Sequence, residues 1–347
     1  MRTTLLALLL FLLPAALAQE LVVYSGRTKP LVEPLVRAFE KETGVRVRVR
    51  YGRDPELLAA LAEEGLRSPA DLFWANGSAA LAAAGRLGLL APLPEELRAR
   101  PAAFVPKSGR WVPLSLRLRV LAYAPGRVDP GALPRSVLEL PELKGFSGRI
   151  GWTPGYASFQ DFVTALRLLH GEETARRWLL GMKALAPKAY ASNTAMLLAL
   201  ASGEIDLALT NHYYVFRLLK GVPEGAYEGD EEEEGDEGAA RAPEGAVAIH
   251  RFAPGDVGNL ALVTGGGVLR GARHRSPALR FLAFLLSPKA QEFQARSVYE
   301  YPVVRGVQTP PGLLPVEEAL KLGPRIDPER LKDLKGTLRL LREVGIL

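Results

Sequence analysis

Short apolar segments alternate with amphipathic segments in this chain, and that order constrains the fold more than any other feature. Residues 21–25 have the pattern of a buried strand, residues 34–43 that of a helix, and residues 45–51 alternate Val with Arg as a strand with one wet face does. Alternating strands and helices form open α/β sheets, where ligands bind at the carboxyl ends of the strands. We therefore expect a ligand near residues 25–29 and 75–78.

The pattern repeats in a second half of the chain. Residues 149–153 begin another strand-and-helix unit, and the extended run 111–124 is long enough to cross between two lobes as a hinge strand. The predicted fold class is therefore α/β, with two α/β lobes joined by hinge strands, as in periplasmic binding proteins. The predicted division assigns residues 19–117 and 256–298 to the first lobe, and residues 118–255 and 299–347 to the second.

The first eighteen residues have the features of a secretory signal peptide. An apolar run at 5–13 follows Arg2, and Ala16-Leu17-Ala18 forms a small-residue cleavage site. A membrane anchor is the alternative, but the run is shorter than the roughly 20 residues that a spanning helix needs. The chain contains no cysteine, which excludes a lipidated cysteine, a disulfide and a thiolate metal ligand. We expect an exported, periplasmic protein.

Composition and charge narrow the class further. The chain has 347 residues, 48% of them hydrophobic and 24% charged, which suits a globular protein with two lobes. Its formal charge is +6, yet the basic residues are scattered, so we expect no nucleic-acid partner. One segment, 228–238, is acidic and rich in Gly. It is either a solvated, flexible loop or a metal-scavenging arm, and repulsion between like charges favours the loop.

Tyr213 and Tyr214 follow an apolar run and begin a helical pattern, so they lie at a predicted strand-to-helix junction. Neighbouring side chains diverge on a regular strand or helix, and a junction lets two phenols converge. Asn211 is placed to cap the helix with its side chain, and the positive end of the helix dipole favours phenolate. Paired phenolates suit a hard, highly charged cation. His212 lies beside the pair, and we expect it to pack or cap rather than coordinate.

Catalytic patterns are missing from the sequence. It contains no Gly-x-Ser-x-Gly elbow, no cysteine nucleophile, no His-Glu-x-x-His and no phosphate-binding loop with Gly-Lys-Ser/Thr. A hydrolase would need a nucleophile that these patterns do not supply. We therefore expect a binding protein and not an enzyme.

Several segments taken together resemble the periplasmic ferric-ion-binding proteins that feed ABC-type iron importers. The likeness extends over nearly the whole chain after residue 18 and is carried by residues 23–26, 68–73, 148–151, 154–159, 190–193, 203–209 and 211–214. In that family adjacent tyrosines bind Fe(III) as phenolates from the second lobe. The resemblance therefore implies that Tyr213 and Tyr214 are metal ligands.

Other ligand positions of the family depart from its pattern. Many relatives have a His after the first strand and a Glu after the third, where this chain has Thr28 and Asn76. Another branch of the family has a third tyrosine, and its position corresponds by spacing to Phe159. Tyr156, three residues earlier, is either a substitute ligand or an aromatic residue at the rim.

The resemblance also implies a synergistic anion, carbonate or phosphate, that completes the iron shell. The N-terminus of a helix offers free N–H groups to an anion, and arginine binds oxyanions with two parallel hydrogen bonds. The candidate anion-binding residues are Arg27, Arg117, Ala157, Ser158, Asn193 and Asn211.

The sequence thus predicts a periplasmic Fe(III) receptor that delivers its cargo to an ABC permease. We expect a monomer whose contact with the membrane is limited to that permease. The alternative is a receptor for an organic anion such as a phosphonate or a sugar phosphate, which the missing His and Glu favour. Lobe closure about the strands near Arg117 and Gly255 would signal the loaded state to the permease.

Overall fold

The computed structural model describes residues 19–221 and 241–347. The predicted signal peptide, residues 1–18, and the acidic run 228–238 lie outside these described residues. Within the described part, none of the helices combines the length and the apolar character needed to cross a membrane.

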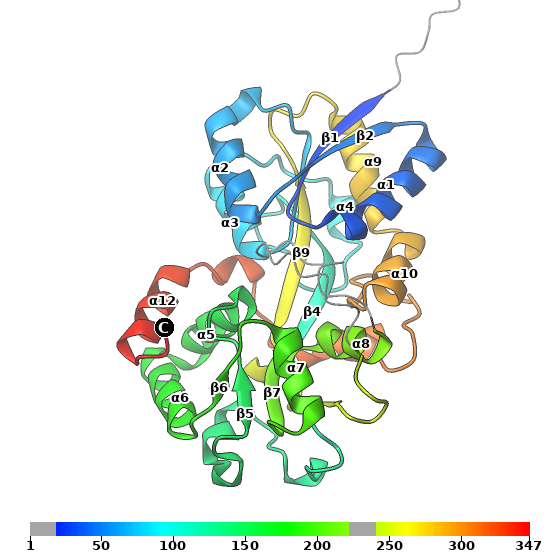
Figure 1. The fold of residues 1–347 in the computed structure, drawn as a ribbon. Coiled ribbons are helices and arrows are strands. Elements are labelled where there is room, and N and C mark those ends of the chain that lie inside the picture. The colour runs from blue at the N-terminus through cyan, green and yellow to red at the C-terminus, as the bar shows by residue number, and fades with distance from the viewer. Residues whose placement is uncertain (1–18, 222–240) are drawn as a thin grey trace, which may run out of the picture.

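The first lobe is built on three parallel strands in the order β2, β1, β3, flanked by helices (Figure 1). Its strands are β1 (Glu20–Ser25), β2 (Arg46–Tyr51) and β3 (Leu72–Ala75). Its helices are α1 (Lys29–Thr43), α2 (Asp54–Glu64), α3 (Ser78–Arg86), α4 (Glu95–Arg98), α9 (Arg275–Leu285), α10 (Pro288–Ser297) and α11 (Val316–Leu322). Helix α1 begins five residues before the predicted start, because Pro30 is accommodated in a first helical turn, where its missing N–H is not needed.

Two long strands connect the lobes. Strand β4 (Val112–Tyr123) pairs through its first half with β9 (Ala261–Val268). Its second half pairs with β7 (Leu207–Asn211) and β8 (Ala248–His250). In Figure 1, β4 and β9 run side by side from one lobe toward the other. The predicted crossing strand is confirmed, and it joins both halves into one sheet of nine strands. Eight of them follow the order β2-β1-β3-β9-β4-β7-β5-β6, in which β5 is Ile150–Trp152 and β6 is Lys188–Ala189, and β8 pairs with β4 outside this order.

The second lobe surrounds the remaining strands with helices. Its strands are β5 (Ile150–Trp152), β6 (Lys188–Ala189), β7 (Leu207–Asn211) and β8 (Ala248–His250). Its helices are α5 (Ala157–His170), α6 (Glu172–Ala184), α7 (Asn193–Ser202), α8 (His212–Lys220) and α12 (Leu334–Glu343).

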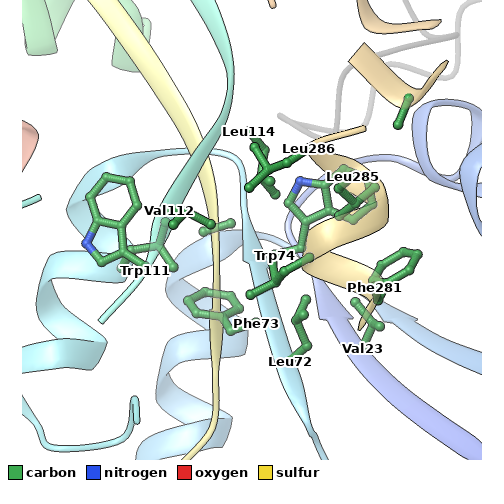
Figure 2. Close-up of a cluster of buried hydrophobic side chains, with 14 of the residues drawn as sticks. Val23, Leu72, Phe73, Trp74, Trp111, Val112, Leu114, Phe281, Leu285 and Leu286 are labelled. Carbon is green, nitrogen blue, oxygen red and sulfur yellow. The ribbon is translucent and has the colours of Figure 1, made fainter. Parts of the chain in front are cut away.

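Each lobe has its own hydrophobic core. Figure 2 shows the first, where Trp74 meets Phe281 edge-on with ring centroids 6.1 Å apart. The division of the chain between lobes stays a prediction. Within the segment 299–347, the buried apolar side chains of residues 301–320 belong to the first core, and those of residues 326–344 belong to a second core.

Candidate metal and anion site

Tyr213 and Tyr214 lie in the first turn of α8, directly after β7. Their exposed fractions are only 3% and 4%, and their ring centroids lie 4.4 Å apart with 31° between the ring planes. The backbone is extended at Asn211 and helical from His212, so the bend that convergence requires is present. The two predicted ligands are therefore brought together and removed from bulk water.

The prediction that Asn211 caps α8 with its side chain is wrong. Asn211 occupies the N-cap position, but its side chain makes no capping hydrogen bond. Its amide donates to the Tyr213 hydroxyl over 3.3 Å, and its carbonyl oxygen accepts from Nη1 of Arg119 over 3.1 Å. The side chain is therefore occupied in linking a phenol to a guanidinium instead of satisfying the helix start.

Arg119 connects the two tyrosines to α5. It is buried in β4, and its Nη1 also donates to the Ser158 hydroxyl over 3.5 Å. Burial lowers the pKa of Arg119 to about 10, while the neighbouring Tyr213 and Tyr214 oppose this shift. A cation at this place favours phenolate over phenol, because the charges attract where water is excluded.

The N-terminus of α5 contributes the next group of predicted residues. Tyr156 is the N-cap residue and is half-buried, Ala157 is exposed, and Ser158 is half-buried. The first N–H groups of a helix have no partner within it, so Ala157 and Ser158 present donors at this end. Phe159 lies in the core, with its ring centroid 5.6 Å from that of Trp152. The structure therefore leaves Tyr156 as the aromatic residue at the start of α5.

Asn193 and Thr28 each hold a buried polar atom with no hydrogen-bond partner among the described residues. In Asn193, the first residue of α7, this atom is Nδ2, while its Oδ1 accepts from the Thr210 hydroxyl over 3.0 Å. In Thr28, at the N-cap of α1, the atom is Oγ1. Buried polar atoms are almost always satisfied, so each of these two positions suits an additional ligand or water.

The first-lobe side of the site is cationic. Arg27 is buried, and its Nη1 donates to Oδ1 of Asn76 over 2.9 Å. Arg117 donates from Nη2 to the Asn76 carbonyl over 2.6 Å. Asn76, where relatives of the predicted family carry Glu, thus holds two guanidiniums in place.

Arg27 also forms a buried ion pair with Glu300. Its Nη2 lies 2.9 Å from Oε1 of Glu300, and the Ser115 hydroxyl donates to the other carboxylate oxygen. Burial by itself would raise the pKa of Glu300, but Arg27 and Arg117 outweigh this effect and hold that pKa below its ordinary value. Glu300 is therefore ionised and completes a network that reaches both lobes.

Both ring nitrogens of His212 form hydrogen bonds with backbone atoms. Its Nδ1 accepts from the Leu118 N–H over 3.0 Å, so the proton of the neutral ring lies on Nε2, which donates to the Tyr299 carbonyl over 2.7 Å. Burial lowers the pKa of His212 to about 3. The expectation that His212 packs rather than coordinates is confirmed by these contacts.

The two lobes contact each other through residues near the hinge strand and α3. A cavity of about 30 Å³ is lined by residues of both lobes, among them Ser78, Arg117 and Asp161. Ser78 at the start of α3 donates to the Pro328 carbonyl over 3.4 Å, and Trp111 donates from Nε1 to Glu329 over 3.0 Å. The two lobes are therefore in contact with each other.

Three charged residues of the site were missed by the sequence analysis. Arg119 follows Arg117 by two positions on β4, so strand periodicity could have found it. Arg217 lies one helical turn after Tyr213 and places its guanidinium 4.4 Å from the centroid of that ring, a spacing that helical periodicity predicts. Glu300 gave no sequence signal, because its partner Arg27 is 273 residues away.

In residues 19–221 and 241–347, no three side chains of Asp, Glu, His or Cys gather in a way that could hold a metal ion. The paired phenols remain a predicted metal-binding group.

Two α/β lobes that close over a buried polar site define the class of two-lobed binding proteins. Residues 21–300 match the family described as bacterial extracellular solute-binding protein, and the chain belongs to this family.

The chain is also similar in sequence to curated proteins that are described as binding ferric iron. The chain is 32% identical over 337 residues to the Fe(3+)-binding periplasmic protein of Serratia marcescens, covering 96% of this chain and 92% of the relative. It is also 32% identical over 351 residues to the major ferric iron-binding protein of Neisseria meningitidis serogroup B, covering 99% and 98%. The resemblance to periplasmic ferric-ion-binding proteins and the predicted location outside the cytoplasm are confirmed.

Solved structures agree with the fold. Iron-bound HitA from Pseudomonas aeruginosa superposes with a TM-score of 0.77 at 33% identity, covering 94% of this chain and 99% of HitA. The Trichodesmium protein IdiA (FutA), in complex with iron and citrate, gives a TM-score of 0.78 at 26% identity, covering 94% and 100%. The predicted fold class is therefore confirmed.

Proposed function

We propose that this protein is a periplasmic receptor that binds Fe(III) through Tyr213 and Tyr214 as phenolates, together with a synergistic anion. The observation that carries the proposal is the buried tyrosine pair, with ring centroids 4.4 Å apart, beside the guanidinium of Arg119. The ferric-binding relatives support the same cargo.

The chemistry follows from the ligand types. A free phenol has a pKa of about 10, and a trivalent cation displaces its proton at neutral pH. Arg119 and the start of α8 lower the cost of the phenolate charges before the metal arrives. Tyr156, at the start of α5, supplies a third phenol to the iron.

The anion completes the iron shell. Carbonate or phosphate would accept hydrogen bonds from the N–H groups of Ala157 and Ser158 and from the orphaned Nδ2 of Asn193. The amide of Asn211 adds a donor that it now gives to Tyr213. From the first lobe and the hinge strand, Arg27 and Arg117 would neutralise the anion. These are the residues that the sequence predicts for the anion.

Cargo delivery follows from the two-lobed architecture. The phenols are buried in the closed arrangement, so iron enters an open form and closure presents a distinct surface to an ABC permease. We propose a monomer in which the anion connects the iron on the second lobe to the arginines of the first.

Visible absorbance tests the proposal. Fe(III) added to the iron-free protein with carbonate should give a phenolate charge-transfer band, and Tyr213→Phe/Tyr214→Phe should remove it. Tyr190→Phe is the control, because Tyr190 is a tyrosine whose hydroxyl bonds to Glu204 outside the proposed site. A colourless wild-type protein that binds a phosphonate or a sugar phosphate instead would establish the organic-anion alternative.

A further inference from the structure

The residues 298–301 form a strap, and each of them contacts the tyrosine helix, the hinge strand or a first-lobe arginine. The Val298 carbonyl accepts from Arg217 over 3.5 Å, the Tyr299 carbonyl accepts from His212, and Glu300 binds Arg27. Tyr301 pairs with Leu116 of β4 through two backbone hydrogen bonds. The strap therefore places the Glu300 carboxylate between α8 and the first lobe.

The backbone of the strap is held in an uncommon conformation. Tyr299 has φ of 60°, a value that non-glycine residues rarely adopt, and its ring stacks on Phe216 of α8 with centroids 5.9 Å apart. Such a conformation persists only where the surroundings enforce it, and it is found mainly at functional sites. The position of Glu300 is therefore fixed by contacts on both sides.

One guanidinium is ion-paired with the Glu300 carboxylate, and two more interact with it electrostatically. Glu300 is 1% exposed and interacts electrostatically with Arg27, Arg117 and Arg217. Arg27 is in turn repelled by Arg117 and Arg217. These four side chains carry a net charge of +2, the charge that a divalent oxyanion neutralises.

We propose that Glu300 is the internal counter-anion of the three arginines named above, Arg27, Arg117 and Arg217, and that it sets their affinity for the exogenous oxyanion. It holds Arg27 in place, and it lowers the positive potential so that the site matches a divalent anion rather than a more highly charged one. This inference rests on the proposed function, in which two of these arginines, Arg27 and Arg117, face the synergistic anion.

Titration of inorganic phosphate into the iron-free, carbonate-free protein at pH 8 tests the inference by calorimetry. Glu300→Gln keeps the shape of the side chain and a hydrogen-bond acceptor for Arg27, but it removes the negative charge. A unit charge at this range shifts a pKa by about 1–3 units, so phosphate should bind about tenfold more tightly or better. Unchanged or weaker binding overturns the inference.

A charge-restoring variant separates charge from structure. Arg27→Gln/Glu300→Gln removes both members of the ion pair and returns the remaining cluster to +2, so its phosphate affinity should lie within about threefold of wild type. Arg27→Gln alone should weaken phosphate about tenfold, which tests the inference even if Glu300→Gln fails to fold. If the double variant binds phosphate as Glu300→Gln or as Arg27→Gln does, the inference is overturned.

A control variant completes the design. Glu64→Gln changes a first-lobe carboxylate that binds Tyr24 and Arg50, and it should leave phosphate affinity unchanged. The phosphate titrations contain no iron. A missing phenolate band in the wild-type protein would therefore refute the proposed function without changing the outcome of these titrations. Conversely, a coloured iron complex together with an unresponsive Glu300→Gln refutes only the role of Glu300.

Discussion

The two sides of the interlobe site differ in what they offer a metal. The second lobe presents two buried phenols, with an amide and the N-terminus of α5 beside them. The first lobe and its adjoining strap present Arg27 and Asn76, and their carboxylate, Glu300, is already paired. The second lobe therefore offers phenol ligands to a trivalent cation, whereas the first lobe offers arginines and a carboxylate that is already paired.

This difference indicates that the two lobes have different roles in binding. Iron should load on the second lobe, and the first lobe should respond to the bound anion instead of to the metal. Relatives of the predicted family that carry His and Glu at the positions of Thr28 and Asn76 would coordinate the metal from both lobes. In this chain, Asn76 instead fixes Arg27 and Arg117.

The largest expected effect comes from removing a phenolate. Tyr213→Phe or Tyr214→Phe should each weaken Fe(III) binding by more than about 100-fold, because even partners outside the ligand shell cost 10–100-fold when mutated. Competition with a chelator measures the affinity, and the charge-transfer band should weaken in parallel. If either variant retains wild-type affinity, iron is not held by this pair.

Arg119→Gln should have the next largest effect. Arg119 supports Asn211 and Ser158 and favours phenolate, so its loss should weaken Fe(III) binding about 10–100-fold. Arg127→Gln is the matched control, since Arg127 pairs with Asp206 at the far end of β7. Equal effects of the two substitutions would show that Arg119 acts only through stability.

Tyr156→Phe should have a smaller effect, of about tenfold, since Tyr156 lies half-buried at the edge of the site. Loss of one phenolate should also reduce the intensity of the absorbance band. An unchanged affinity and an unchanged band would make Tyr156 an aromatic residue of the rim.

The last prediction concerns the acid stability of the fold and not iron affinity. His212 has its pKa lowered to about 3, against about 6.5 in an unfolded chain, so the unfolded state takes up the proton first as pH falls. Its contribution is complete above pH 6.5 and is lost between about pH 6.5 and 3, by a few kcal/mol. Urea unfolding at several pH values should show a weaker pH dependence for His212→Asn. The exposed His170, changed to Asn, should behave as wild type.

The strand and helix order was predictable because it depends on local periodicity. The crossing strand at 111–124 was found from its length alone, and β4 confirms it. The start of α1 was misplaced because a proline in the first turn and a proline within the helix look alike in sequence.

The candidate site was predictable in part. Tyr213 and Tyr214 stand together in the sequence, and the junction of β7 and α8 keeps them together in space. The capping role of Asn211 was predicted wrongly, because Arg119 comes from a strand 92 residues away and competes for the same side chain. Helix-capping propensity depends on a residue and its neighbours in the chain. It carries no information on a distant partner such as Arg119.

By itself the sequence determined the two α/β lobes, the family and the vicinal phenols, all of which depend on residues close together in the chain. Tertiary structure alone decided that Glu300 lies against Arg27 and that both ring nitrogens of His212 are occupied. The physical reason is that charge pairing acts through space, and in this protein it joins segments that only the packing of two lobes and a strap brings within 3 Å of each other.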